Sequence, residues 1–575
     1  MVGARSTEHG PRRRLRRLLV VGAAVLATGA AAVAGYVALR GAPVSIGSSG
    51  PDPRSPVRLF TSAWVAGDFR TMYSQLTPAA RAATTYRRFV HTYRQAAATG
   101  SLTAVTVEQG TRVANGAGTV PVVLRSSLFG ALSERLVLPL VQVRNAYRIA
   151  WEPQLAWPGL ARGERLERVS RVPDRRGRIL SNDRQALAHG PANSREYPQG
   201  APFYTITGFV RAPQTRAARR ARVAAGWPAG AKYGQGGLEG SLDRVLGGAP
   251  RIDLVGEGVS GTRLLARHHG RRPRDVVTTL DPTLQADATA ALAGRYGGIT
   301  ILDARNGAVR AAAGIAMDAT QPPGSTFKIV TASAALTAGA ADLDSYYAPA
   351  RYADVGGFKL NNFHHEVCGG TLLTSFANSC NSVFGPVAVA TGGKELYRTA
   401  VKFGFNTRPH IAYPVDESVM PSRTALRNSV ILGVAGIGQA GVAATPLEMA
   451  SVGQVIAGNG LMHPPWIARF PRRFSDHRRS RRVISRRVAG KVAEMMRAVV
   501  SYGTGTSASS SLATVNGKTG TAEVGPDIKT DAWFVGYAPA EAPKVVVSVL
   551  IVHGGVGGEV AAPIARTMIE DALQR

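Results

Sequence analysis

Cysteine is scarce in this chain of 575 residues. Only Cys368 and Cys380 are present, which excludes a small fold held together by a framework of disulfides. The two lie twelve residues apart, so export from the cytoplasm would permit a bridge between them. We expect two free thiols instead, because Cys380 stands directly between Ser379 and Asn381, where it would pack inward as a small apolar side chain.

Lysine is the second shortage. Lysine and arginine together number 69, but only nine of these residues are lysine. Arginine stays protonated in proteins, whereas a lysine can lose its proton and act as a base. A site that uses a cationic side chain as a general base must therefore draw on these nine residues, which include Lys328 and Lys518.

Acidic residues are also few, with 37 Asp and Glu, so the formal net charge is +32. A charge of this size indicates nucleic acid, an anionic membrane or an anionic polymer as a partner, or only a preference for arginine. The basic residues are scattered through every region, so we expect no nucleic-acid partner. Runs such as 216–222 and 478–482 are typical of solvated faces or loops. The length predicts two to four domains.

One long stretch carries no charge. Residues 18–39 would span about 33 Å as a helix, enough to cross a bilayer core of about 30 Å. The arginines before it predict a cytoplasmic tail at residues 1–17, and residues 40–57 have the composition of a linker. We expect a single-pass membrane anchor with the bulk of the chain extracytoplasmic. A cleavable signal peptide, cut near Gly41, is the alternative.

A proline-rich turn runs into an apolar, helix-forming segment at residues 322–336. This pattern places Ser325 at or near the start of a helix. Lys328 follows three residues later and shares a helix face with Ser325, so its amine can reach the serine hydroxyl. A serine and a lysine in this arrangement can act as a nucleophile and its general base. Alone, the same spacing also fits an ordinary helix start followed by an exposed lysine.

Two further motifs follow in order, Ser379-Cys380-Asn381 and Lys518-Thr519-Gly520-Thr521. Together with Ser325 and Lys328 they resemble the active-site serine family of penicillin-binding proteins and serine β-lactamases. The resemblance covers about 300 residues and implies an α+β transpeptidase fold. It also implies covalent acyl transfer that needs no cofactor and no metal.

The resemblance assigns a role to each motif residue. Ser325 is the nucleophile and Lys328 the base, Ser379 relays a proton to the leaving amine, and Asn381 orients Lys328 and the substrate amide. Lys518 supplies positive potential. The hydroxyls of Thr519 and Thr521 hold the terminal carboxylate of the substrate, next to Gly520. The backbone amides of Ser325 and Thr521 stabilise the oxyanion.

The rest of the chain suggests a modular organisation. Residues 58–155 show helical patterns followed by four strand-like runs, and they resemble the extension module of resistance-type class B penicillin-binding proteins. Residues 156–275 contain Arg176-Gly177-Arg178 and Gly237-Leu238-Glu239, which resemble parts of the pedestal, or dimerisation, domain. Residues 276–575 are expected to form the α+β transpeptidase domain, with a hairpin at Asn306-Gly307.

Two other constellations compete with this interpretation. Side chains of types that bind metals lie close together in sequence at His364-His365-Glu366 and Cys368. However, adjacent histidines do not share a helix face, and no second ligand cluster is evident. The glycine-rich run at 234–240 lacks the lysine and Ser or Thr of a phosphate-binding loop. We expect neither a metal site nor a nucleotide site.

The expected function is that of a peptidoglycan D,D-transpeptidase which also binds penicillin covalently. Its expected partners are peptidoglycan stem peptides, lipid-linked precursors and β-lactams, together with a membrane glycan polymerase and proteins of cell division or elongation. A D,D-carboxypeptidase or β-lactamase-type hydrolase needs the same residues, because it differs only in whether water or an amine attacks the acyl-enzyme. A scaffold of the wall machinery that retains the motifs is the third alternative.

Overall fold

The computed structural model describes residues 50–469, 479–524 and 529–575. The expected tail (1–17) and anchor (18–39) lie outside the described residues. Among the helices that are described, none is both long enough and apolar enough to cross a membrane.

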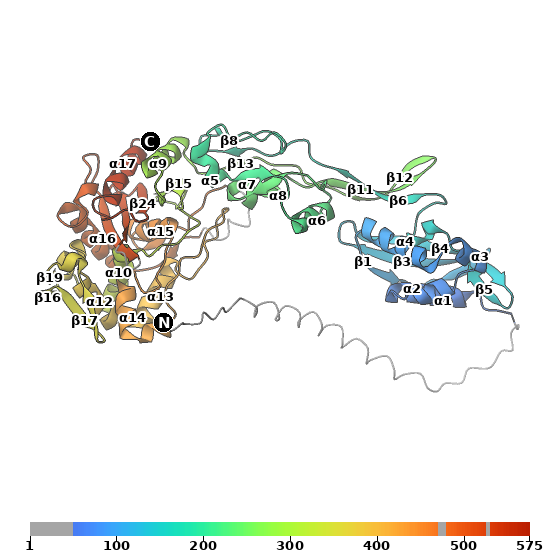
Figure 1. Cartoon of the computed structure of the whole chain (residues 1–575), viewed down its shortest axis with the longest axis horizontal. Coiled ribbons are helices and arrows are strands. Elements are labelled where there is room, and N and C mark those ends of the chain that lie inside the picture. Colours follow the sequence, from blue (N-terminus) through green and yellow to red (C-terminus); the bar gives the residue numbers. More distant parts are fainter. Residues whose placement is uncertain (1–49, 470–478, 525–528) are drawn as a thin grey trace, which may run out of the picture. The chain divides into compact units, whose positions relative to one another are not determined.

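The N-terminal part, blue in Figure 1, consists of helices followed by strands, as the sequence predicts. Val57, Phe60 and Trp64 lie on one face of the first helix because they are spaced by three and four residues, and this face is buried. The strands form one sheet in the order β1-β3-β4-β5, with β2 paired to β3. The elements are α1 (Arg54–Ala66), α2 (Phe69–Ser74), α3 (Pro78–Ala83), α4 (Tyr86–Thr99), β1 (Leu102–Val107), β2 (Arg112–Ala114), β3 (Ala117–Ser126), β4 (Gly130–Val143) and β5 (Ala146–Ile149).

The part that follows contains three small sheets, with the strand orders β12-β11-β6, β10-β9 and β13-β7-β8. Buried ion pairs connect the two motifs singled out in its sequence. Glu239 is fully buried and pairs with Arg176 at 2.6 Å and with Arg195 at 2.7 Å. The elements are β6 (Arg165–Arg171), β7 (Ile179–Leu180), β8 (Ala186–Ala188), α5 (Tyr204–Thr207), β9 (Phe209–Arg211), α6 (Arg216–Ala224), β10 (Tyr233–Gln235), α7 (Gly237–Ser241), α8 (Asp243–Leu246), β11 (Arg251–Gly258), β12 (Gly261–His268) and β13 (Val276–Val277).

The C-terminal part is built on an antiparallel sheet in the order β15-β14-β24-β23-β22. Strands from both ends of the region therefore share one sheet, and Asn306-Gly307 lies in the connection between the first two, as the sequence predicts. Apolar side chains alternate along β23, so that one face packs against α17 and the other against α15. The elements are α9 (Pro282–Leu292), β14 (Gly297–Asp303), β15 (Val309–Gly314), β22 (Asn516–Val524), β23 (Lys529–Ala538), β24 (Val545–Ile551) and α17 (Ala561–Leu573).

Between these strands the longer elements are helices. Short two-stranded sheets, which the sequence did not predict, interrupt the helices. The elements are α10 (Lys328–Ala338), β16 (Tyr346–Ala350), β17 (Tyr352–Val355), β18 (Phe358–Asn361), β19 (Cys368–Thr371), α11 (Leu372–Ala377), α12 (Asn381–Thr391), α13 (Gly393–Phe403), α14 (Ser429–Gly436), α15 (Pro446–Ala457), β20 (Leu461–Met462), β21 (Arg481–Arg482) and α16 (Arg486–Ser501).

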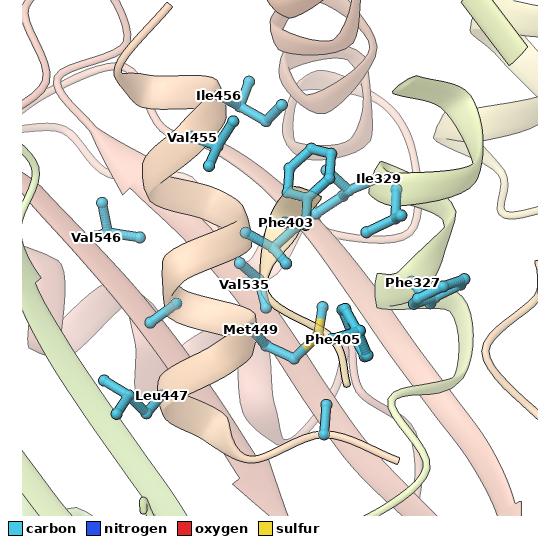
Figure 2. Close-up of a cluster of buried hydrophobic side chains, with 14 of the residues drawn as sticks. Phe327, Ile329, Phe403, Phe405, Leu447, Met449, Val455, Ile456, Val535 and Val546 are labelled. Carbon is cyan, nitrogen blue, oxygen red and sulfur yellow. The ribbon is translucent and has the colours of Figure 1, made fainter. Parts of the chain in front are cut away.

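One large apolar core joins the sheet to the helices. Figure 2 shows Met449 of α15 among side chains contributed by distant segments, including Val535 of β23 and Phe327. The ring of Phe327 packs edge-on against Phe405, with ring centroids 5.2 Å apart. Because Phe327 is only two residues from Ser325, this packing fixes the turn that carries the serine.

Candidate active site

Ser325 lies in a single 3-10 turn, Gly324–Phe327, and α10 begins directly after it at Lys328. The position at a helix start is therefore confirmed. Two side-chain hydrogen bonds help to hold the turn. Thr326 Oγ1 donates to the carbonyl of Pro323 at 2.7 Å, and Trp533 Nε1 donates to the carbonyl of Pro322 at 2.8 Å. The second bond fixes the serine turn to the central sheet.

The side chain of Lys328 is completely buried. Its Nζ donates to the carbonyl oxygen of Ser379 at 2.6 Å and to Oδ1 of Asn381 at 2.7 Å, and it lies 3.4 Å from Ser379 Oγ. Within the described part of the chain, no hydrogen bond joins this amine to the hydroxyl of Ser325. The structure therefore brings the first two motifs together through the lysine.

Burial lowers the pKa of Lys328 well below its usual value, and repulsion from the ammonium group of Lys518 lowers it further. Burial also lowers the pKa of Lys518, to about 7. Desolvation disfavours the charged form of a lysine, so the site favours Lys328 as a neutral amine. A neutral amine has two N–H donors, and the two short bonds to Ser379 and Asn381 use both of them. Its lone pair remains available to accept a proton.

The two cysteines are joined in a disulfide, with Cα atoms 5.5 Å apart, so the expectation of free thiols is wrong. Cys380 does pack inward, as expected, but its partner in the core is the sulfur of Cys368 on β19. The bridge ties this strand to the turn that carries Ser379 and Asn381. Ser379 itself has a φ of 60°, a left-handed conformation that is uncommon for a residue with a side chain.

The third motif lies on β22, beside the serine turn. Gly520 is required there because a Cβ atom would lie 2.8 Å from the carbonyl oxygen of Pro323 and 2.9 Å from Thr326 Cγ2. Lys518 is completely buried and donates to the carbonyl of Thr519 at 3.0 Å. The strand can thus approach Ser325 closely only where it has no side chain.

The hydroxyls of the third motif already have partners in the protein. Thr519 Oγ1 lies 2.6 Å from Thr504 Oγ1, and Thr521 Oγ1 accepts a hydrogen bond from the backbone of Gly557 at 3.3 Å. Sequence reasoning missed Thr504. Its only sequence signal is the turn-forming run Gly503-Thr504-Gly505 after α16.

Two asparagines were also missed. Asn381 Nδ2 donates to the carbonyl of Asn361 at 3.0 Å, and the side chain of Asn362 accepts from the backbone N–H of Ser382 at 2.8 Å. These contacts connect the end of β18 to the start of α12. They orient the amide of Asn381 so that its oxygen faces Lys328.

A cavity of about 620 Å³ lies at the site. Ser325, Ser379, Asn381, Thr519 and Thr521 line it, together with Thr504 and the segment 358–366. His364, His365 and Glu366 are exposed on its rim. Among the described residues, no group of three or more His, Cys, Asp or Glu side chains is arranged to hold a metal ion. The cavity presents the hydroxyls of Ser325 and Ser379, the amide of Asn381 and the hydroxyls of three threonines.

The chain resembles known proteins over most of this architecture. Residues 297–570 match the family model of the penicillin binding protein transpeptidase domain, and residues 52–164 match that of an NTF2-like N-terminal transpeptidase domain. Peptidoglycan D,D-transpeptidase PbpA of Mycolicibacterium smegmatis is 30% identical over 490 residues, which cover 72% of this chain and 93% of that protein. This chain belongs to the class B penicillin-binding proteins.

Two further similarities agree with membership of the class B penicillin-binding proteins. Peptidoglycan D,D-transpeptidase PbpA of Mycobacterium tuberculosis is 29% identical over 486 residues, which cover 72% of this chain and 93% of that protein. A solved structure of penicillin-binding protein A from M. tuberculosis, a penicillin G acyl-enzyme complex, aligns with a TM-score of 0.55 and 27% identity. The alignment covers 70% of this chain and all of that one.

Proposed function

We propose that this chain is a peptidoglycan D,D-transpeptidase that crosslinks stem peptides through an acyl-enzyme on Ser325 and that binds penicillin covalently at the same residue. The observation that carries the proposal is the environment of Lys328. Its amine is completely buried, is disfavoured in its charged form, and is hydrogen-bonded to both Ser379 and Asn381. An amine whose charged form is disfavoured can accept the proton of Ser325, which is what activation of that serine requires.

The first half-reaction forms the acyl-enzyme. The Oγ atom of Ser325 attacks the carbonyl carbon of the penultimate D-alanine, and its proton passes to the neutral amine of Lys328. The amides of Ser325 and Thr521 stabilise the oxyanion. When the C–N bond breaks, the proton returns through Ser379 to the nitrogen of the leaving D-alanine. With penicillin the broken bond belongs to the lactam ring, so the leaving nitrogen stays attached to the acyl group.

The second half-reaction transfers the acyl group. The amine of a second stem peptide attacks the ester carbonyl and gives up a proton through Ser379 to Lys328. A new amide bond forms as the C–O bond to Ser325 breaks, and Ser325 recovers its proton from Lys328. In the first step Lys518, Thr519 and Thr521 hold the terminal carboxylate of the donor, and Gly520 lets the strand lie against the serine turn. Asn381 holds Lys328 in place throughout.

The remaining parts of the chain fit a membrane-bound wall enzyme. We assign residues 18–39 to a single-pass anchor that leaves the catalytic domain (276–575) outside the cytoplasm. Residues 58–155 form an extension domain and residues 156–275 a pedestal that together hold the site away from the membrane. The partners expected of such an enzyme are a membrane glycan polymerase and proteins of division or elongation. Lipid-linked precursors are the source of its stem-peptide substrates.

Labelling with a fluorescent penicillin tests the proposal. Wild-type protein and the Ser325→Ala variant are compared, with Ser501→Ala, a serine outside the site, as the matched control. A label that requires Ser325 and persists for many minutes supports a transpeptidase. Rapid loss of the label with release of penicilloate instead indicates a hydrolase. A crosslinking assay on lipid-linked substrate with a polymerase then measures transfer directly, and its failure in an enzyme that binds penicillin would contradict the proposed reaction.

A further inference from the structure

A glycine-rich loop forms part of the cavity wall. It runs from His553 to Gly558, between β24 and α17, and four of its six residues are glycine. Val556 and Gly558 line the cavity. At Gly557 a Cβ atom would lie 2.2 Å from the carbonyl oxygen of Gly520, so the loop lies directly against the strand of the third motif. The position of the loop therefore sets the shape of the cavity beside β22.

The loop depends on its neighbours for a fixed conformation. Glycine has access to many backbone conformations, so contacts from outside must select one for a segment with four glycines. Two adjacent residues of β23 provide such contacts. Thr530 exchanges two hydrogen bonds with Gly555: its carbonyl accepts from the N–H of Gly555 at 3.0 Å, and its Oγ1 donates to the carbonyl of Gly555 at 2.9 Å. Asp531 Oδ1 accepts from the N–H of His553 at 2.9 Å.

Asp531 is the more unusual of these two residues. Its side chain is completely buried, and its second oxygen, Oδ2, has no hydrogen-bond partner within the described part of the chain. Burial raises the pKa of this carboxyl, and the hydrogen bond from His553 opposes the rise. The ring of His553 is half exposed, with Nδ1 3.7 Å from Asp531 Oδ1, and it supplies a balancing charge when it is protonated. A buried carboxylate with an unpaired oxygen is costly, so an apolar side chain would serve packing better at this position.

The turn into the loop is made at His553. This residue has a φ of 53°, a left-handed conformation that is uncommon for a residue with a side chain. Its N–H is the group that donates to Asp531. The carboxylate therefore stabilises the turn at the point where the loop begins.

The other end of the loop contacts the catalytic strand. The N–H of Gly557 donates to Thr521 Oγ1 at 3.3 Å. Thr521 belongs to the third motif, and its backbone amide is one of the two proposed oxyanion donors. Movement of the loop away from β22 would break this bond and widen the cavity beside Thr521. The contacts that hold the start of the loop thus bear on a residue of the reaction.

We infer that Asp531 is a positioning residue for acyl transfer, which holds the loop 553–558 against β22 so that the third motif meets the substrate in one arrangement. The inference rests on the proposed function and deepens it. Asp531 does not itself line the cavity, so it acts through the backbone of His553 and through Gly557.

The test uses two substitutions and one matched control in the full chain. Asp531→Ala removes the acceptor of the His553 bond, whereas Asp531→Asn keeps an oxygen that can accept it. The control is Asp281→Ala, which removes another buried carboxylate of the same domain. Asp281 accepts from the first turn of α9 and pairs with Arg310 at 3.0 Å, and it does not line the cavity. Melting curves give the loss of stability in each variant.

Two quantities are measured. Hydrogen exchange followed by mass spectrometry reports opening of the loop, and we expect exchange at 553–558 to be about tenfold faster in Asp531→Ala, the effect of one hydrogen bond to a charged group. Intact-protein mass spectrometry with benzylpenicillin reports acylation of Ser325, which should slow about tenfold. Asp531→Asn should stay within about threefold of wild type, and Asp281→Ala should match wild type in both measurements.

Three results would overturn the inference. The first is loop exchange that does not change in Asp531→Ala, and the second is a loop that opens without slower acylation. The third is equally slow acylation in Asp281→Ala, because general loss of stability would then explain the effect. If Asp531→Ala does not fold, Thr530→Val removes the neighbouring bond to Gly555 and should show the same pattern with a smaller effect.

A further measurement separates this inference from the proposed reaction. Wild-type protein that forms no adduct with penicillin would contradict the proposed function. In the Ser325→Ala background, ligand-observed NMR titration then measures non-covalent binding of benzylpenicillin with and without Asp531→Ala. Weaker binding in the double variant supports the inference even in that case, and equal or absent binding contradicts it.

Discussion

Loss of the disulfide between Cys368 and Cys380 should impair both the stability and the chemistry of this protein. The bridge connects β19 to the turn that carries Ser379 and Asn381, and the buried amine of Lys328 donates to both of these residues. The perturbation is reduction of the bridge, or its removal in a Cys368→Ala/Cys380→Ala double variant. Either change frees the turn to move relative to the lysine.

The size of the effect on stability follows from the separation of the cysteines. They are 12 residues apart in sequence. Closing a loop of this length removes about 9.5 cal/mol/K of entropy from the unfolded chain, which is about 3 kcal/mol at 25 °C. The kinetic effect has a different origin. A neutral amine that loses one of its two short hydrogen bonds is misplaced as a base, and acylation should slow about tenfold.

The assay uses one protein in two redox states. Intact mass first establishes that the bridge is present, and the rate of labelling with a fluorescent penicillin is then measured with and without a phosphine reductant. The double variant is the control, because its labelling rate should equal that of reduced wild type and should not respond to the reductant. Urea unfolding of the same samples gives the change in free energy.

One result would refute this reasoning. If reduced wild type and the double variant label within about twofold of the oxidised protein, the contacts of Lys328 alone position Ser379 and Asn381. A large loss of stability without loss of labelling would show that the bridge serves the fold and not the site.

Two further predictions concern the strand of the third motif. Gly520→Ala should slow penicillin labelling at least about tenfold, because the new Cβ would lie 2.8 Å from the backbone of the serine turn and force the strand away from it. Gly490→Ala, at an open helix position, is the control and should have no effect. Lys518→Met should move the acid side of the pH profile of acylation to higher pH, because loss of the second ammonium raises the pKa of Lys328. The shift is partial, since burial is the larger cause of the lowered pKa of Lys328 and remains in the variant. A profile that stays in place while the rate falls would show that the two lysines do not interact.

Much of the fold could be predicted from local patterns. The periodicity of the first helix, the alternation in the strands after it and the turn at Asn306-Gly307 all depend on residues close together in sequence, and the structure contains each of them. The helix start at Ser325 was predictable for the same reason, since prolines precede it and an apolar segment follows. The short sheets between β16 and β21 were not predicted, because strands of two to five residues give too little alternation to detect.

The contacts of the site were harder to predict than its residues. The three motifs could be identified in the sequence, but the bond between Lys328 and the carbonyl of Ser379 depends on a left-handed backbone that no side-chain pattern encodes. The disulfide was missed because inward packing of Cys380 fits a free thiol and a bridged one equally well. Thr504 was missed because its partner Thr519 lies 15 residues away on another element, and one threonine between glycines has no distinguishing pattern.

Two of the few lysines in this chain, Lys328 and Lys518, have completely buried amines. Both have pKa values lowered by burial, and repulsion from Lys518 lowers that of Lys328 further. Two neighbouring titratable groups with separated pKa values can hold opposite protonation states at one pH. On the proposed mechanism Lys328 is neutral and serves as the base, while Lys518, with a pKa of about 7, becomes protonated when a carboxylate binds beside it. The added charge then lowers the pKa of Lys328 further, so binding of the correct substrate itself favours the neutral base.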